Sequence, residues 1–81
     1  MLMNSLIQLN KLKYGEKAIV CKNCSSGNIR RRLMDIGLVE NTPVECVGIN
    51  PMGDPAAYLI KGAVIAIRSH DCSDIYVKLL R

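Results

Sequence analysis

Four cysteines and one histidine are the residues of this chain with the greatest capacity for chemistry. Cys21 and Cys24 are separated by two residues, which is the spacing of a pair of metal ligands or of a redox pair. An Fe²⁺ or Zn²⁺ ion bound by this pair would need further ligands, which His70 or Cys72 would supply. One hypothesis is therefore a metal-binding module built from these four residues.

Strand geometry argues against this hypothesis. Residues three apart in a regular strand face opposite sides, so Cys21 and Cys24 converge only if the chain turns at Asn23. A single CxxC motif is also a weaker signal than two such motifs at a suitable distance. Cys46 lies within a predicted strand, where a thiol commonly serves as a small apolar side chain. Both a metal site and a purely structural role for the thiols therefore remain open.

The sequence does not indicate catalysis. His70-Asp71-Cys72 contains a nucleophile and a base, but adjacent residues of a short loop do not converge as a triad. The phosphate-binding pattern Gly-x-x-x-x-Gly-Lys is also missing from the sequence. We therefore expect a protein that is neither an enzyme in general nor an NTPase in particular.

Composition indicates one folded domain over residues 1–81. Apolar residues make up 49% of the chain, and because Trp and Phe are absent we expect a core of Ile, Leu, Val, Ala and Met. The amino terminus lacks a basic region and a cleavage site, and no apolar run is long enough to span a membrane. These features predict a cytoplasmic protein with reduced thiols.

The elements that would position these residues are short. Apolar runs and turn residues predict strands over 17–22, 44–49, 58–60, 64–68 and 75–79, with one helix over 28–36. A leading segment is expected to pack on the sheet through Leu6, Leu9 and Leu12. Because closure removes exposed strand edges, we expect a mainly β fold. The predicted fold is a small SH3-like β-barrel of about five strands, with the helix inserted after the first strand.

The helix has a defined face and a defined end. Ile29, Leu33 and Ile36 recur at helical spacing, so this face should meet the core. One of the two serines before the helix is expected to cap its first turn. Gly37 occupies the position that needs a left-handed backbone, and Leu38 should then pack back on Leu33.

Two turns are predicted by their residues. Pro51, Gly53 and Pro55 punctuate the chain between the second and third strands, since proline restricts φ and glycine permits positive φ. Lys61-Gly62 is the expected tight turn of the following hairpin.

The arginine run at residues 30–32 is not a nucleic-acid motif, because successive helical positions point about 100° apart. A binding stripe would keep its charges on one face and add stacking aromatic residues. Protein contact is the better interpretation of this region. Arg30 and Met34 share an exposed side of the helix, and Met52 is a second exposed apolar residue in its turn. The predicted partner surface therefore combines Arg30, Met34 and Met52.

Three of these segments together resemble the FeoA family: the helix end at residues 32–38, the turn at 51–55 and the strand at 62–68. The resemblance covers roughly residues 6 to 79. It implies an SH3-like barrel that works in the cytoplasm beside FeoB, a membrane Fe²⁺ transporter with a GTP-binding domain. It also implies an accessory and regulatory role by protein contact. The residues themselves lead us to expect neither membrane insertion nor nucleic-acid binding, although the net charge of +4 keeps a nucleic-acid-binding barrel as a third hypothesis. The expected state is a monomer or a weak dimer.

Overall fold

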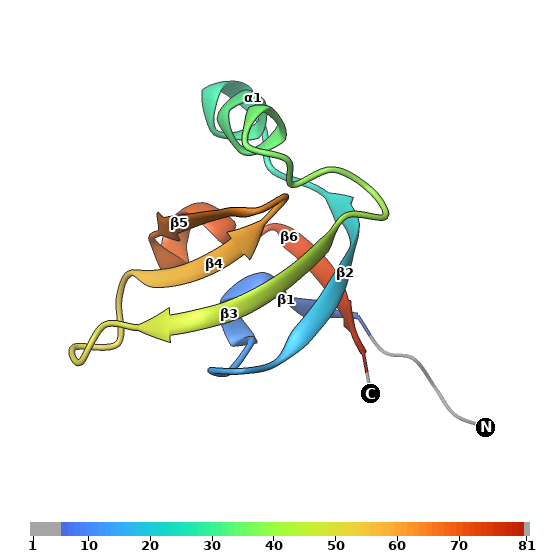
Figure 1. Ribbon diagram of the computed structural model, residues 1–81. Coiled ribbons are helices and arrows are strands. Elements are labelled where there is room, and N and C mark those ends of the chain that lie inside the picture. The colour runs from blue at the N-terminus through green and yellow to red at the C-terminus, as the bar shows by residue number, and fades with distance from the viewer. Residues whose placement is uncertain (1–5, 81) are drawn as a thin grey trace.

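The computed structural model describes residues 6–80, which form one bent antiparallel sheet with a single helix above it (Figure 1). The strands are β1 (Ile7–Gln8), β2 (Lys17–Asn23), β3 (Pro43–Ile49), β4 (Ala56–Ile60), β5 (Ala63–Ile67) and β6 (Ile75–Leu79). The helix α1 is Gly27–Asp35, and two 3₁₀ turns are η1 (Leu9–Lys11) and η2 (Ser69–Cys72). No helix within the described range is long and apolar enough to cross a membrane.

The strands follow the order β1-β6-β2-β3-β4-β5 in the sheet. All neighbouring pairs are antiparallel, so β1 and β5 are the two edges. The mainly β prediction and the position of the helix after the first long strand are confirmed. The prediction missed β1, whose Ile7 pairs with Val77 from the other end of the chain. A strand of two residues has no sequence period of its own, so only this long-range pairing creates it.

The leading segment packs on the sheet through two of its three predicted anchors. Leu9 and Leu12 are buried, whereas Leu6 is 42% exposed. Residues three apart share a face in a 3₁₀ turn, which explains why Leu9 and Leu12 point inward together. Leu6 precedes that turn, so its prediction as an anchor was wrong.

The end of α1 matches the sequence prediction in detail. Gly37 has a φ of +108°, in the left-handed region that favours glycine. The Leu38 N–H donates to the Leu33 carbonyl at 2.9 Å, and the Gly37 N–H donates to Met34 at 3.0 Å. These two bonds form a Schellman motif, and the buried side chains of Leu33 and Leu38 both belong to the core.

The start of α1 differs from the prediction. Ser26 is the N-cap residue, but its side chain makes no capping hydrogen bond. The Ser25 hydroxyl instead donates to the side-chain oxygen of Asn23, which also accepts the Ser25 N–H at 3.0 Å. The prediction of a serine cap was therefore wrong: Ser26 makes no such bond, and the Ser25 hydroxyl bonds locally to Asn23 instead.

The turn predicted over residues 51–55 is present and is organised by the residue before it. The Asn50 side chain accepts the Met52 N–H at 2.8 Å, and the Asn50 carbonyl accepts the Gly53 N–H at 2.6 Å. Gly53 has a φ of +92°, as the prediction required. The Asp54 carboxylate accepts the N–H of the first residue of η2 at 2.8 Å, which ties the turn to the barrel.

The core contains no methionine among the described residues. Met34 and Met52 are 40% and 89% exposed, as the prediction of both as exposed residues required, so neither supplies the methionine that composition led us to expect in the core. The largest fully buried side chain is Tyr58 of β4, so the aromatic ring in this core comes from a tyrosine, since the chain has no Phe or Trp. Two cysteines, Cys46 and Cys72, are also fully buried.

Candidate partner-binding surface

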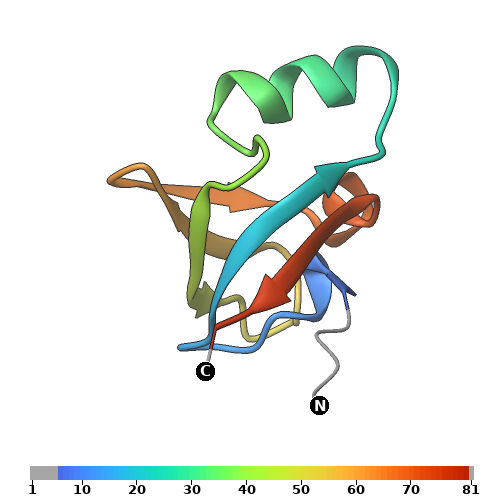
Figure 2. The ribbon, with the colours of Figure 1, turned by 90° about the vertical axis from the view of Figure 1, so that its right-hand side faces the viewer.

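The three residues predicted to contact a partner do not share one surface. Arg30 and Met34 lie on α1, at one end of the molecule. Met52 lies in the turn between β3 and β4, at the opposite end (Figures 1 and 2). The Arg30 guanidinium is also held in place, since it donates to the Asn23 carbonyl at 2.6 Å. The helix and the turn are therefore separate candidate contacts.

Met34 borders two hollows on the surface beside α1. One hollow, of about 290 Å³, is lined by residues of the helix itself, including Arg31 and Asp35. The other, of about 390 Å³, lies between α1 and the segment after it and is bordered by Leu38 and Val39. Arg30 and Met34 line both hollows. This arrangement places an adaptable apolar side chain beside cations, a combination enriched at protein interfaces.

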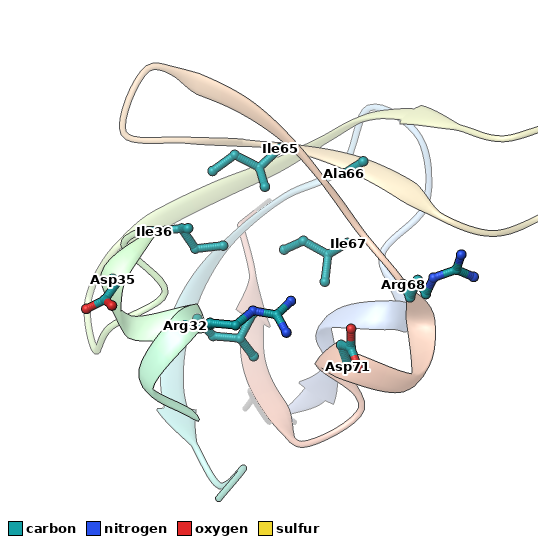
Figure 3. Close-up of a pocket in the computed structure, with 9 residues that line it drawn as sticks. Arg32, Asp35, Ile36, Ile65, Ala66, Ile67, Arg68 and Asp71 are labelled. Atoms are coloured by element: carbon teal, nitrogen blue, oxygen red, sulfur yellow. The ribbon is translucent and has the colours of Figure 1, made fainter. Parts of the chain in front are cut away.

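A third hollow lies between α1 and β5 and was not anticipated from the sequence. Its volume is about 410 Å³, and Figure 3 shows apolar side chains from both elements in it, among them Ile36 and Ile67. The Arg32 side chain reaches into the space, whereas Asp35 is directed away from it (Figure 3). The available signal was the position of Arg32 beside the apolar stripe of the helix. That signal does not reveal which strand lies opposite.

The predicted metal ligands are not gathered into one site. Within residues 6–80, no group of three or more His, Cys, Asp or Glu side chains is placed to hold one metal ion. Cys21 lies at a bulge of β2, Cys24 is exposed in the loop after it, and His70 is exposed in η2. Cys72 is buried in the same 3₁₀ turn, so the four predicted ligands do not assemble.

The two buried thiols are held in their protonated form. The Cys72 Sγ lies 3.5 Å from the Arg68 carbonyl, and burial raises its pKa to about 11. Burial also raises the pKa of Cys46, whose Sγ lies 3.7 Å from the Gly48 carbonyl. Because the thiolate is the form that binds metals and reacts with electrophiles, both residues serve as core side chains.

Differential alkylation is expected to separate the four thiols. With iodoacetamide at pH 8, Cys24 should react first and Cys21 more slowly. Cys46 and Cys72 should react on the order of a hundredfold more slowly, because they must first be exposed by opening of the fold. Mass spectrometry of peptides over a time course measures the four rates. Reaction of Cys72 as fast as Cys24 would contradict its burial, and labelling in urea provides the control.

A bent six-stranded antiparallel sheet with one helix after its first long strand defines this protein as a small SH3-like β-barrel domain. Within that class its family is shown by sequence as well. Residues 7–79 match the FeoA domain family, and the chain belongs to this family.

Solved structures agree with this assignment. A FeoA-like protein from Clostridium acetobutylicum superposes with a TM-score of 0.88 at 33% identity, covering 98% of this chain and 92% of that one. The FeoA of Stenotrophomonas maltophilia, a zinc complex described as a procaryotic SH3 domain protein, superposes with a TM-score of 0.76. It is 24% identical, with 88% of each chain covered, so the likeness supports the fold alone.

One curated relative links this domain to a larger chain. A fusion of Fe(2+) transport protein A with the Fe(2+) transporter FeoB, from Porphyromonas gingivalis, is 27% identical over 74 residues. The match covers 91% of this chain, which spans only 9% of the length of the fusion protein.

Proposed function

We propose that this protein is a small cytosolic accessory of a FeoB-type ferrous-iron transporter, and that it acts by protein contact without catalysis. The Porphyromonas gingivalis relative carries this proposal, because there a similar domain and a FeoB transporter belong to one chain. A covalent link holds two domains at high effective concentration. Where the domains are on separate chains, surface complementarity must supply the association.

The surface around Met34 supports this function. Met34 is 40% exposed and borders two hollows, and Arg30 beside it is already ordered by its hydrogen bond to β2. An ordered arginine loses little side-chain freedom on binding, which lowers the entropic cost of contact. The proposed contact is therefore centred on α1, and the turn that carries Met52 is a second candidate.

A matched pair of methionine variants tests the location of the contact. Met34→Glu is expected to weaken binding to the cytoplasmic GTPase domain of the cognate transporter by tenfold or more, on the order of a hot-spot residue. Met52→Glu makes the same chemical change at the opposite end and should leave affinity within about twofold. Isothermal titration calorimetry gives both constants. A larger loss of affinity for Met52→Glu than for Met34→Glu would show that the contact lies at the turn instead.

Chemical-shift mapping separates this function from metal binding. With the GTPase domain, ¹H–¹⁵N shifts are expected at Arg30 and Met34. With Zn²⁺ or anaerobic Fe²⁺, saturable micromolar shifts at Cys21 and Cys24 would instead favour the metal-binding module. If no chemical shift changes on addition of the intact cytoplasmic part of the transporter, the accessory role is rejected.

A further inference from the structure

The edge strand β5 has one side that no other strand of the described sheet occupies. It pairs with β4 on one side, and among residues 6–80 no strand pairs with its other side. Its sequence, Ala63-Val64-Ile65-Ala66-Ile67, has no charge and no proline, two of the features that natural proteins use to block edge pairing. Val64 is 64% exposed. The strand therefore retains the capacity to accept another strand.

The register of the hairpin shows which backbone groups are free. Lys61 and Gly62 have φ values of +49° and +84°, as in a type I′ turn of two residues. In such a hairpin the flanking pair is hydrogen-bonded, and bonded pairs then alternate along the ladder. Ala63 therefore bonds to β4, and the N–H and C=O groups of Val64 and Ala66 point away from it. Among residues 6–80, neither Val64 nor Ala66 makes a backbone hydrogen bond to a turn, a loop or a helix end.

The hollow between α1 and β5 lies beside this free edge. Its apolar lining includes Ile36 from the helix and Ile65 and Ile67 from the strand (Figure 3). An added strand alternates its side chains above and below the sheet. Side chains on the helix-facing side would enter the hollow of about 410 Å³, so both backbone pairing and apolar contact are available here.

Charge identifies the chemistry of the incoming segment. Lys61 lies in the turn two residues before β5, Arg68 directly follows the strand, and Arg32 reaches into the hollow (Figure 3). Two carboxylates, Asp35 and Asp71, also line the hollow, but Asp35 is directed away from it. An extended segment along β5 would pass a cation at each end, which favours acidic residues at its own ends.

A second copy of this chain fits the edge poorly. An antiparallel pairing of two β5 strands centred on Ile65 would place Arg68 of one copy beside Gly62 of the other. Each Arg68 would then lie close to the Lys61 of the opposite copy, at both ends of the pairing. Like charges in neighbouring cross-strand positions are destabilising, and the net charge of +4 per chain adds to the repulsion.

We propose that β5 is a strand-addition site that receives an extended segment of the partner, apolar in its middle and acidic at both ends. The segment pairs with the free backbone of Val64 and Ala66 and inserts an apolar side chain into the hollow beside Ile36. This inference rests on the proposed function, since the source of the segment is the cytoplasmic part of the FeoB-type transporter.

Hydrogen exchange of the full chain with the cytoplasmic part of the cognate transporter tests strand addition directly. The Val64 and Ala66 amides should exchange rapidly in the free chain and be slowed at least tenfold in the complex. Contact through side chains alone would leave both amides unprotected. A complex that forms with protection confined to α1 would overturn strand addition while keeping the accessory role. If no complex forms, both proposals fail.

Variants of the edge provide the second readout. Val64→Pro removes an outward N–H without interrupting the β4–β5 ladder, and proline is tolerated at such edge positions. It should weaken transporter binding roughly tenfold through the lost hydrogen bond and its crowding of the edge. Val64→Thr keeps the N–H and serves as the control. Equal affinity of the proline and threonine variants would overturn the proposal.

Charge reversal tests the acidic ends even if the proline variant fails to fold. Arg68→Glu is expected to weaken binding about tenfold at low salt, with a smaller effect at high salt. Lys11→Glu makes the same change of charge at an exposed residue of η1 that borders none of the three hollows described above, and it is the matched control. An equal loss in both variants would indicate general electrostatic attraction and would contradict a specific site at β5.

Discussion

Gly37→Val is expected to leave the domain largely unfolded. The φ of +108° places Gly37 in a region that β-branched residues avoid, at a cost of about 1–2 kcal/mol. A Cβ at this position would also lie 3.0 Å from the Lys61 Cδ and 3.1 Å from the Ile60 Cγ2. The Lys61 side chain is flexible and can move, but Ile60 is fully buried and cannot do so without disturbing the core.

The sum of these effects is large for a domain of 81 residues. Overpacking of a core typically costs about 1–3 kcal/mol in addition to the backbone strain. The total stability of a small domain is roughly 0.05–0.15 kcal/mol per residue, so the loss removes much of the folding free energy. Urea denaturation followed by circular dichroism should show the midpoint falling sharply or the transition disappearing.

Gly53→Val is the matched control for this experiment. Gly53 has a similar φ of +92°, but a Cβ there has no neighbouring atom within 4 Å. The control therefore introduces the backbone strain without the contact with Ile60. It should cost only about 1–2 kcal/mol. Equal losses at the two glycines would show that packing against Ile60 does not matter.

Tyr58→Ala is expected to destabilise the protein by about 3–5 kcal/mol, the range for removal of a buried aromatic ring. Tyr58 is the largest fully buried side chain, and no Phe or Trp is present to fill the space it would leave. Its hydroxyl contributes much less, because its hydrogen bond to the Leu9 carbonyl is long, at 3.5 Å. Tyr58→Phe should therefore cost less than about 1 kcal/mol.

Comparison of Tyr58→Phe with the wild type also tests how stability depends on pH in the alkaline range. Burial raises the pKa of Tyr58 above its usual value of 10.0, so the folded state favours the neutral phenol. Its contribution is fully present below pH 10 and is lost as pH rises further, because only the unfolded chain ionises readily there. Tyr58→Phe should lose less stability than the wild type above pH 10. Parallel pH profiles from denaturant titrations would contradict this assignment.

Local features of the fold were predictable because neighbouring residues decide them. The helix stop at Gly37 and Leu38 depends on one backbone conformation and on hydrogen bonds within six residues. The Lys61-Gly62 turn likewise depends on two positive φ values. The strand ranges agreed to within two residues for the same reason, since alternating apolar residues report directly on an inner and an outer face.

Features that join distant segments were not predictable. The β1 strand exists because Ile7 meets Val77, and Leu6 lies before this strand, outside the 3₁₀ turn that buries Leu9 and Leu12. The candidate site shows the same limit. Arg30 and Met34 are neighbours on α1, as expected, but Met52 lies at the other end of the barrel (Figures 1 and 2).

The sequence by itself determined the class of fold, the family and the ends of the elements, because these depend on periodicity and turn chemistry along the chain. Only the tertiary structure decided that Cys46 and Cys72 are core side chains and that the predicted metal ligands do not assemble. It also decided that Arg32 faces β5 across a hollow. These properties depend on which surfaces the bent sheet brings together, and the spacing of residues along the chain does not reveal which distant residues become neighbours in space.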